Sequence, residues 1–309
     1  MNHRVSPQLI LGIVSAAEKI GLEANELLSE IHLTTAILHR SDERISHQQL
    51  CVLWQTILDR TGEEAIGLRL AAYAQPTTYD VVNYVLECSP NLGEALARLS
   101  RYIRLVHEAS VVRLETDGAV TRITHAFVGV SPPLPAATYQ WVMANLFGGI
   151  RRMTGSAFVP LRVGFQQAQP ANPAAFDRFF QTRVQFLQPV NELCLDSRLL
   201  QQPLLLSNDG LVTVLDRYAT ESIAKLPQAN SLVNQVQREI QLHLQSDDPK
   251  LDTIAQALQL SSRTLQRKLK EAGTSYQVLL DEVRRELAIA YVRERSNISF
   301  RSRFFTWLL

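Results

Sequence analysis

Apolar residues in the first part of the chain recur at helical spacing. The first such face consists of Leu9, Ile13, Ala17 and Ile20, with Gly21 placed to end the helix. Ser46 is a good N-cap for a second long helix. That helix presents Leu50, Leu53, Trp54 and Ile57 at helical spacing. Further helices are predicted near 78–87 and, opened by Asn91, near 91–107. This part of the chain is therefore expected to be largely helical.

The period of the pattern then changes from helical to alternating. Ser110–Glu115 and Val120–Phe127 are β-branched runs separated by a turn at Thr116–Ala119, which predicts a hairpin. A helix is expected around 136–153. Short strands are expected at Leu161–Phe165, Val184–Phe186 and Glu192–Leu195, with a helix at Pro173–Phe180 among them. These elements predict an α+β domain over residues 1–205, mostly helical with a small sheet.

A different organisation follows residue 205. Leu211–Tyr218 has a helical pattern, and Lys225–Asn230 is a polar break, so residues 206–230 are interpreted as a connecting helix and linker. Nothing between Ser231 and Thr306 suggests a strand. Residues 231–309 are therefore expected to form an all-α domain.

Composition limits the class of protein. The 309 residues are 46% apolar and 20% charged, which is typical of a soluble globular chain of two domains. No apolar run approaches the ~18 uncharged residues of a membrane helix, and the N-terminus fits an amphipathic helix better than a signal peptide. The three cysteines lie far apart without a CxxC pair, so we expect buried reduced thiols and a cytoplasmic protein. They are Cys51, Cys88 and Cys194.

Charge is distributed unevenly along the chain. Residues 250–309 hold eleven Lys and Arg against six Asp and Glu, a net charge of +5, and the remaining residues 1–249 sum to −4. A basic C-terminal segment joined to a mildly acidic N-terminal part is typical of a protein whose C-terminal domain binds a polyanion. The alternative is a solvated helical surface rich in arginine.

The most specific motif is residues 251–277, LDTIAQALQLSSRTLQRKLKEAGTSYQ. Asp252 is expected to cap a short helix with an inward face of Leu251, Ile254, Ala255 and Leu258. Ser261 is expected to cap a second helix, which Gly273 ends. Two short helices joined by a tight turn are typical of a helix-turn-helix.

The second helix of this motif has two distinct faces. Leu265 and Leu269 point inward, whereas the opposite face carries Arg263, Gln266, Arg267 and Lys270. Arg can bind guanine and Gln can bind adenine in bidentate fashion, and Lys suits phosphate. The pattern therefore predicts a helix that reads DNA. An ordinary surface helix with a polar face is the competing interpretation.

The sequence resembles the AraC/XylS-type transcription regulators. Residues 265–276, LQRKLKEAGTSY, and the later RRELA at 284–288 with Tyr291 are similar to the DNA-binding domain of that family. IGLRL at 66–70, PNLGEAL at 90–96 and residues 186–203 are similar to the arabinose-binding sensor domain of one branch, so the resemblance spans most of residues 5–296. It implies that Arg263, Gln266 and Arg267 contact bases, with Ser261 and Lys270 beside them on the DNA. It also implies a small-molecule effector, a homodimer, double-stranded DNA as partner, and contact with RNA polymerase.

The chain departs from the family pattern at two places. Gln259 stands where the family usually has Gly at the turn. After Ser299 the chain reads FRSRFFTWLL, where the family continues into a second helix-turn-helix. A frameshift, a truncation or a genuine short form would each give this ending. We expect weaker DNA binding and poor order from about residue 292. The alternative function is a protein that binds a ligand and dimerises without useful DNA binding.

Other candidate chemistry is weak. The seven histidines form no metal-binding spacing, no GxSxG is present, and enzyme activity is only a remote alternative, so no metal, cofactor or catalytic residue is expected. The Gly148-Gly149 pair is interpreted as close helix packing. A sensor pocket is expected in residues 1–205, but the sequence assigns neither its ligand nor its residues. Aromatic candidates, for which core packing is the alternative, are Trp54, Tyr84, Phe127, Tyr139 and Trp141.

Overall fold

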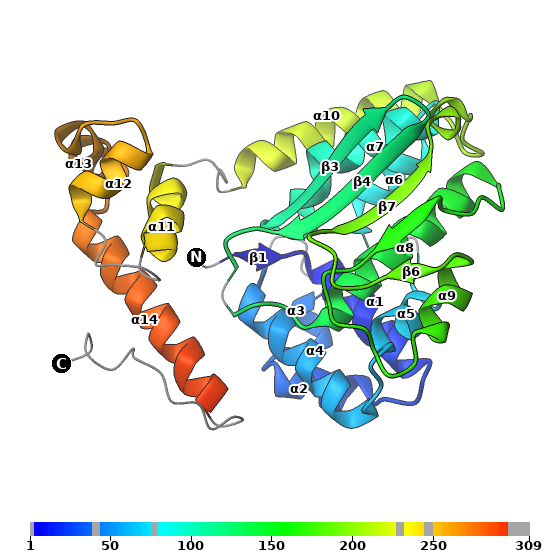
Figure 1. Cartoon of the computed structure of the whole chain (residues 1–309), viewed down its shortest axis with the longest axis horizontal. Helices are drawn as coiled ribbons and strands as arrows, with labels where there is room; N and C mark the ends of the chain where they lie inside the picture. Colours follow the sequence, from blue (N-terminus) through cyan, green and yellow to red (C-terminus); the bar gives the residue numbers. More distant parts are fainter. Residues whose placement is uncertain are drawn as a thin grey trace. The chain divides into compact units, whose positions relative to one another are not determined.

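The computed structural model describes residues 3–38, 44–75, 79–130, 132–226, 232–243 and 250–295. The chain divides into two compact units, with the division between helix α10 (Asp209–Lys225) and helix α11 (Leu232–His243) (Figure 1). Each unit is described by itself below.

The first unit contains the small sheet. Its strands are β3 (Ser110–Asp117), β4 (Val120–Phe127), β5 (Arg162–Gly164), β6 (Val184–Gln185) and β7 (Asn191–Asp196). They are ordered β3-β4-β7-β5-β6, and every pair is antiparallel except β5 with β6. A separate two-stranded ribbon joins β1 (Arg4–Val5) to β2 (Ile45–Ser46). The predicted hairpin and the three short strands are thus present, each within two residues of its expected bounds.

The first unit contains more helix than strand (Figure 1). They are α1 (Pro7–Glu18), α2 (Ala24–Glu30), α3 (Thr35–Leu38), α4 (His47–Thr61), α5 (Ile66–Ala71), α6 (Val81–Glu87), α7 (Leu92–Tyr102), α8 (Ala136–Thr154), α9 (Ala174–Phe180) and α10 (Asp209–Lys225). Both predicted caps are confirmed. Ser46 and Gln49 form a reciprocal capping box at α4, and Asn91 Oδ1 accepts from Glu94 N at 2.9 Å. The combination of helices and a small sheet confirms a mixed helix-and-sheet fold.

Helix α8 contacts α4, α5, α7, α9 and β7 in the first core. Trp141 on α8 and Trp54 on α4 are fully buried and meet edge to face, with ring centroids 6.0 Å apart. Helix α5 approaches α8 so closely that a Cβ added at Gly67 would lie 2.1 Å from the Ala137 carbonyl oxygen. Gln140 joins the same two helices, because its side-chain oxygen accepts from Gly67 N at 3.2 Å. A residue without a side chain is therefore required at position 67.

The Gly148-Gly149 pair on α8 does not pack closely against another element, contrary to the prediction. A Cβ added at either glycine would meet no atom within 4 Å, so the interpretation of this pair as close helix packing is wrong. The pair instead lies where α8 borders open space, and Gly149 lines the cavity described below. Two adjacent glycines in a helical pattern do not by themselves distinguish packing from a hollow.

Helix α10 packs against α6 and α7 within the first unit. The Tyr102 hydroxyl at the end of α7 donates to Asp216 Oδ1 at 2.8 Å and lies 2.9 Å from Thr220 Oγ1. Arg98 Nε is 3.3 Å from the same carboxylate. The sequence assigned residues 206–230 to a connecting helix and linker, but the helical part of this segment is held on the first unit by these contacts.

The described residues of the second unit, 232–243 and 250–295, form helices joined by short turns and include no strand. Its helices are α11 (Leu232–His243), α12 (Leu251–Ala257), α13 (Ser262–Glu271) and α14 (Tyr276–Arg295). They enclose a separate small core of Val236, Ile240, Ile254, Ala255, Leu265, Leu269, Leu279, Leu280 and Val283. The apolar ending at 300–309 lies outside the described residues, and so does most of the segment expected to lose order.

Candidate DNA-reading helix and ligand cavity

Helices α12 and α13 are two short helices joined by a tight turn, as the sequence predicts. Ser261 is the N-cap of α13, and its hydroxyl accepts from Thr264 N at 3.2 Å. At the other end Gly273 is left-handed, with φ +74°. Thr274 N donates to Leu269 O and Gly273 N donates to Lys270 O, each at 3.0 Å, which is the Schellman pattern. Both ends of α13 are therefore fixed by local hydrogen bonds.

The predicted cap at the start of α12 is wrong. The N-cap is Lys250, which makes no side-chain capping bond, and Asp252 lies inside the first turn. From there the Asp252 carboxylate accepts a hydrogen bond from the Ser262 hydroxyl on α13. An acidic residue in the first turn still suits the helix dipole, but this one also joins the two helices.

The turn between the two helices contains a strained residue. Gln259 is left-handed, with φ +55°. A side chain in this conformation costs on the order of 1 kcal/mol relative to Gly. Gln259, which replaces the Gly usual in the family, therefore lies at a position whose backbone conformation favours Gly.

Helix α13 buries one face and exposes the other. Leu265 and Leu269 are fully buried, whereas Arg263, Gln266, Arg267 and Lys270 are all exposed, as is Ser261 at the cap. Arg267 Nη1 is 2.5 Å from Glu271 Oε1 one turn later, with both side chains about three-fifths exposed, at 63% and 60%. Exposed pairs of this kind contribute little stability and exchange readily for another anion. The helix thus offers a row of basic and amide groups to a polyanion.

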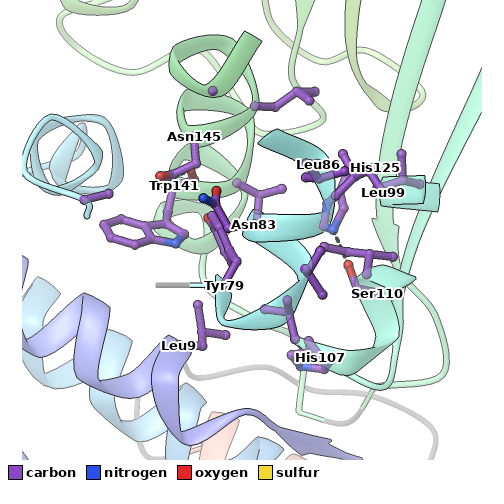
Figure 2. A pocket seen from close by; sticks show the side chains of 18 of the residues that line it. Leu9, Tyr79, Asn83, Leu86, Leu99, His107, Ser110, His125, Trp141 and Asn145 are labelled. Carbon is purple, nitrogen blue, oxygen red and sulfur yellow. Dashed lines mark hydrogen bonds between the residues drawn. The ribbon is translucent and has the colours of Figure 1, made fainter. Parts of the chain in front are cut away.

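A cavity of about 100 Å³ lies inside the first unit (Figure 2). Residues from α1, α4, α6, α7, α8, β3 and β4 line it, and most of the lining is apolar. Helix α8 contributes one stripe at helical spacing, which includes Thr138, Trp141, Asn145, Gly149 and Arg152.

The aromatic residues singled out in the sequence are placed unequally around this cavity. Trp54, Phe127 and Trp141 line it, whereas Tyr84 is 45% exposed and does not. Tyr139 packs against Phe127, with ring centroids 5.4 Å apart. Residue type alone therefore identified three of the lining residues.

Five buried polar atoms around the cavity have no hydrogen-bond partner among the described residues. They are Trp54 Nε1, Asn83 Nδ2, His125 Nδ1, Thr138 Oγ1 and Trp141 Nε1. Each of these side chains belongs to a residue no more than 4% exposed. Buried polar groups in proteins are almost always paired, because an unpaired one costs about 1–3 kcal/mol. Their concentration around one cavity is what a binding site for a small molecule requires.

Histidines that are distant in sequence meet beside the cavity. His107 Nδ1 accepts from Ala109 N at 3.1 Å, so Nε2 carries the proton and donates to His47 Nδ1 at 3.1 Å. The proton on His47 Nε2 then points to the Pro132 carbonyl oxygen, 2.8 Å away. Burial lowers the pKa of both rings, so both are neutral near pH 7. Sequence spacing missed this contact because the two residues are sixty positions apart.

The described residues contain no group of three His, Cys, Asp or Glu side chains arranged to hold a metal ion. Within the same residues, no helix is both long and apolar enough to cross a membrane. All three cysteines are free and buried. Desolvation raises the pKa of Cys51 to about 12, which keeps this thiol protonated.

Three regulators resemble this chain in sequence over most of its length. The ornithine utilization regulator of Pseudomonas aeruginosa is 27% identical, over 91% of this chain and 82% of that protein. The transcriptional regulator VqsM of the same organism is 24% identical, over 82% of this chain and 79% of its own length. VirS of Mycobacterium tuberculosis is 21% identical, over 92% and 83%. All three are named as regulators rather than enzymes.

Among solved structures, the transcriptional regulator CdpR from Pseudomonas aeruginosa is similar, with a TM-score of 0.48 and 16% identity over 89% of this chain and 85% of that one. The profile of the arabinose-binding domain of AraC transcription regulators, N-terminal, matches residues 21–204, more than half of the chain. The chain therefore belongs to the family of AraC transcription regulators that carry this N-terminal domain.

Proposed function

We propose that this protein is a sequence-specific DNA-binding transcription regulator whose activity is set by a small molecule bound in the cavity of the first unit. The observation that carries the DNA-binding part is the two-faced helix α13, which is capped at both ends and carries its basic and amide side chains on the exposed face. Family membership supports a regulator of this kind.

In this proposal α13 enters the major groove. Arg263 and Arg267 bind guanine O6 and N7, Gln266 binds adenine N6 and N7, and Lys270 neutralises phosphate. Ser261 lies at the N-terminal end of the helix, where N-terminal residues of recognition helices approach the bases. Glu271 gives up its pairing with Arg267 when DNA binds.

The cavity supplies the regulatory part of the proposal. It is enclosed by helices and by the β3–β4 hairpin, it is mostly apolar, and unpaired polar atoms surround it. These are the properties of small-molecule sites in proteins. One relative is named an ornithine utilization regulator, so ornithine is included as a comparison ligand in the tests below.

The DNA-binding part is tested by selecting bound sequences from a random duplex library and measuring affinity by fluorescence anisotropy. Arg263→Ala and Arg267→Ala should each weaken binding to the selected sequence by about 1–3 kcal/mol and relax its base preference. Lys270→Ala should weaken binding to selected and random DNA alike.

Lys268→Ala is the matched control, because Lys268 is an exposed cation on the same helix but away from the reading face. Equal losses for all four variants on both DNAs would show that α13 does not read bases. Absence of any DNA binding by the intact protein would favour a ligand-binding, dimerising protein instead.

A further inference from the structure

We propose that the cavity takes a compact, uncharged and mostly apolar molecule that carries a hydrogen-bond acceptor of the carbonyl type, bound beside Asn83. This inference rests on the proposed function, in which the cavity is the effector site. It adds the chemical class of the effector, which neither the family name nor the relatives' names give for this chain.

The side chain of Asn83 indicates that the ligand carries a hydrogen-bond acceptor. Its Oδ1 accepts from Arg152 Nη2 at 3.5 Å, and this orients the amide so that Nδ2 is left without a partner among the described residues. An amide NH₂ and an indole N–H are donors only, and the buried Trp54 Nε1 is unpartnered in the same way. Figure 2 shows Tyr79, Asn83, Trp141 and Asn145 gathered on one side of the cavity. A molecule bound there must bring an acceptor to satisfy these donors.

The other side of the cavity is less selective. Ser110 Oγ and His125 Nε2 are 2.7 Å apart, as Figure 2 shows, and His125 Nδ1 has no partner in the described part of the chain. Burial lowers the pKa of His125 to about 3, so the ring is neutral and its two nitrogens can exchange donor and acceptor roles. The Ser110 hydroxyl can adapt to either arrangement. This side of the cavity can therefore receive a weakly polar ligand group that is either a hydrogen-bond donor or a hydrogen-bond acceptor.

Charge and polarity exclude two other classes of ligand. Among the described lining residues no acid is present, and the single charged side chain, Arg152, is already paired with Glu87 at 3.3 Å. A diamino acid such as ornithine would place two ammonium groups and a carboxylate in a cavity that offers no acid to pair with the ammonium groups, and a buried unpaired charge is very costly. A pentose would leave most of its hydroxyls against an apolar wall.

Size gives the remaining limit. An engineered apolar cavity of roughly 150 Å³ holds a benzene molecule, whereas drug-sized ligands occupy several hundred Å³. The cavity of about 100 Å³ is smaller than this, which limits the ligand to at most about one ring.

The test uses the full chain and the fluorescence of Trp54 and Trp141, which line the cavity. Cyclohexanone and methylenecyclohexane are matched in shape and differ in the carbonyl oxygen. We expect cyclohexanone to bind about threefold to tenfold more tightly, as one buried hydrogen bond allows. Asn83→Leu should abolish this preference, with Asn83→Ala as a second variant if the first does not fold.

Asn145→Leu is the control, because Asn145 Nδ2 already donates to Trp141 O at 2.8 Å, and it should keep the preference for cyclohexanone. Equal binding of the two probes, binding of neither, or displacement of cyclohexanone by L-ornithine or L-arabinose would overturn the inference. The proposed function fails separately. If cyclohexanone binds through Asn83 but leaves DNA affinity unchanged, the ligand class holds and the regulatory role of the cavity does not. If ornithine changes DNA affinity, the regulatory role holds and the proposed ligand class is wrong.

Discussion

The buried histidines of the first unit link its free energy of unfolding to pH. Burial lowers the pKa of His125 to about 3 and of His3 to about 4, whereas an exposed imidazole in the unfolded chain titrates near 6.5. Between these values the unfolded state binds more protons than the folded state. Stability is therefore highest above about pH 6.5 and is lost as the pH falls towards 4.

Thermal unfolding between pH 7.5 and pH 4.5 measures this dependence. We expect His125→Gln to flatten it, because the variant no longer has an imidazole to protonate on unfolding. His32→Asn is the control, since His32 is exposed and left-handed, a conformation that Asn tolerates. A pH dependence that is unchanged by His125→Gln would contradict this account.

Strain at a single residue is also testable in the second unit. Gln259→Gly should stabilise this unit by about 1 kcal/mol, because Gly adopts a positive φ without the clash that a Cβ introduces. Chemical denaturation of the intact chain, followed by the helical circular dichroism signal, measures the change. A loss of stability would mean that the side chain of Gln259 makes a stabilising contact.

Packing between elements depends on glycine at one position and not at another. Gly67→Ala would place a Cβ 2.1 Å from the Ala137 carbonyl oxygen, so α5 and α8 must separate. We expect a loss of about 1–3 kcal/mol or more. Gly148→Ala is the matched change on α8, where nothing lies within 4 Å, and it should stabilise the helix by about 0.5–1 kcal/mol.

Denaturant midpoints of both glycine variants provide the measurement. Similar effects of the two substitutions would show that the approach of α5 to α8 is looser than described. A gain in stability from Gly67→Ala would have the same meaning.

Sequence reasoning succeeded where the interactions are local. The caps at Ser46, Asn91 and Ser261 and the left-handed Gly273 each depend on residues at most a few positions away. It also found the buried and exposed faces of α13, which follow from helical spacing alone. The same reasoning placed the Asp252 cap wrongly, because the carboxylate's partner lies on the next helix.

Sequence reasoning expected a pocket in residues 1–205, but its polar contacts lay beyond that reasoning. Its distinctive features are contacts between residues far apart in the chain, such as Asn83 with Arg152 and His47 with His107. No periodicity marks these pairs in a single sequence. The polarity of a site also depends on which of its polar atoms find partners, and only the folded chain decides this.

For the whole molecule, an exposed apolar face on α10 bears on assembly. Leu211, Val214 and Tyr218 are 45%, 53% and 58% exposed and share one face of the helix, with Leu205 and Leu206 exposed nearby. Patches of this kind mark interaction sites. We propose that a second copy covers this face, because helix-turn-helix proteins commonly read two half-sites as dimers. The family resemblance implied a homodimer, and α10 offers a surface on which the two copies could meet.

Val214→Asp should weaken self-association, because a like-charged carboxylate would approach its counterpart across a two-fold interface. Sedimentation velocity at tens of micromolar measures it. Thr213→Asp, which is exposed outside this apolar face, is the control. A monomeric wild-type chain, or equal effects of the two variants, would contradict the proposal.

The hydroxyl of Tyr102 has a consequence for signalling. Helix α7 contributes Leu96 and Leu99 to the cavity wall, and its last residue, Tyr102, is tethered to Asp216 on α10, after which the chain leaves the first unit. If the cavity is the effector site proposed above, a molecule that displaces α7 also displaces Tyr102 and, through its hydrogen bonds, α10. The strength of the hydrogen bonds of Tyr102 would then set how much of the binding free energy is transmitted to the rest of the chain. Sensitivity to an effector could therefore be tuned without altering the ligand site or the DNA-binding site.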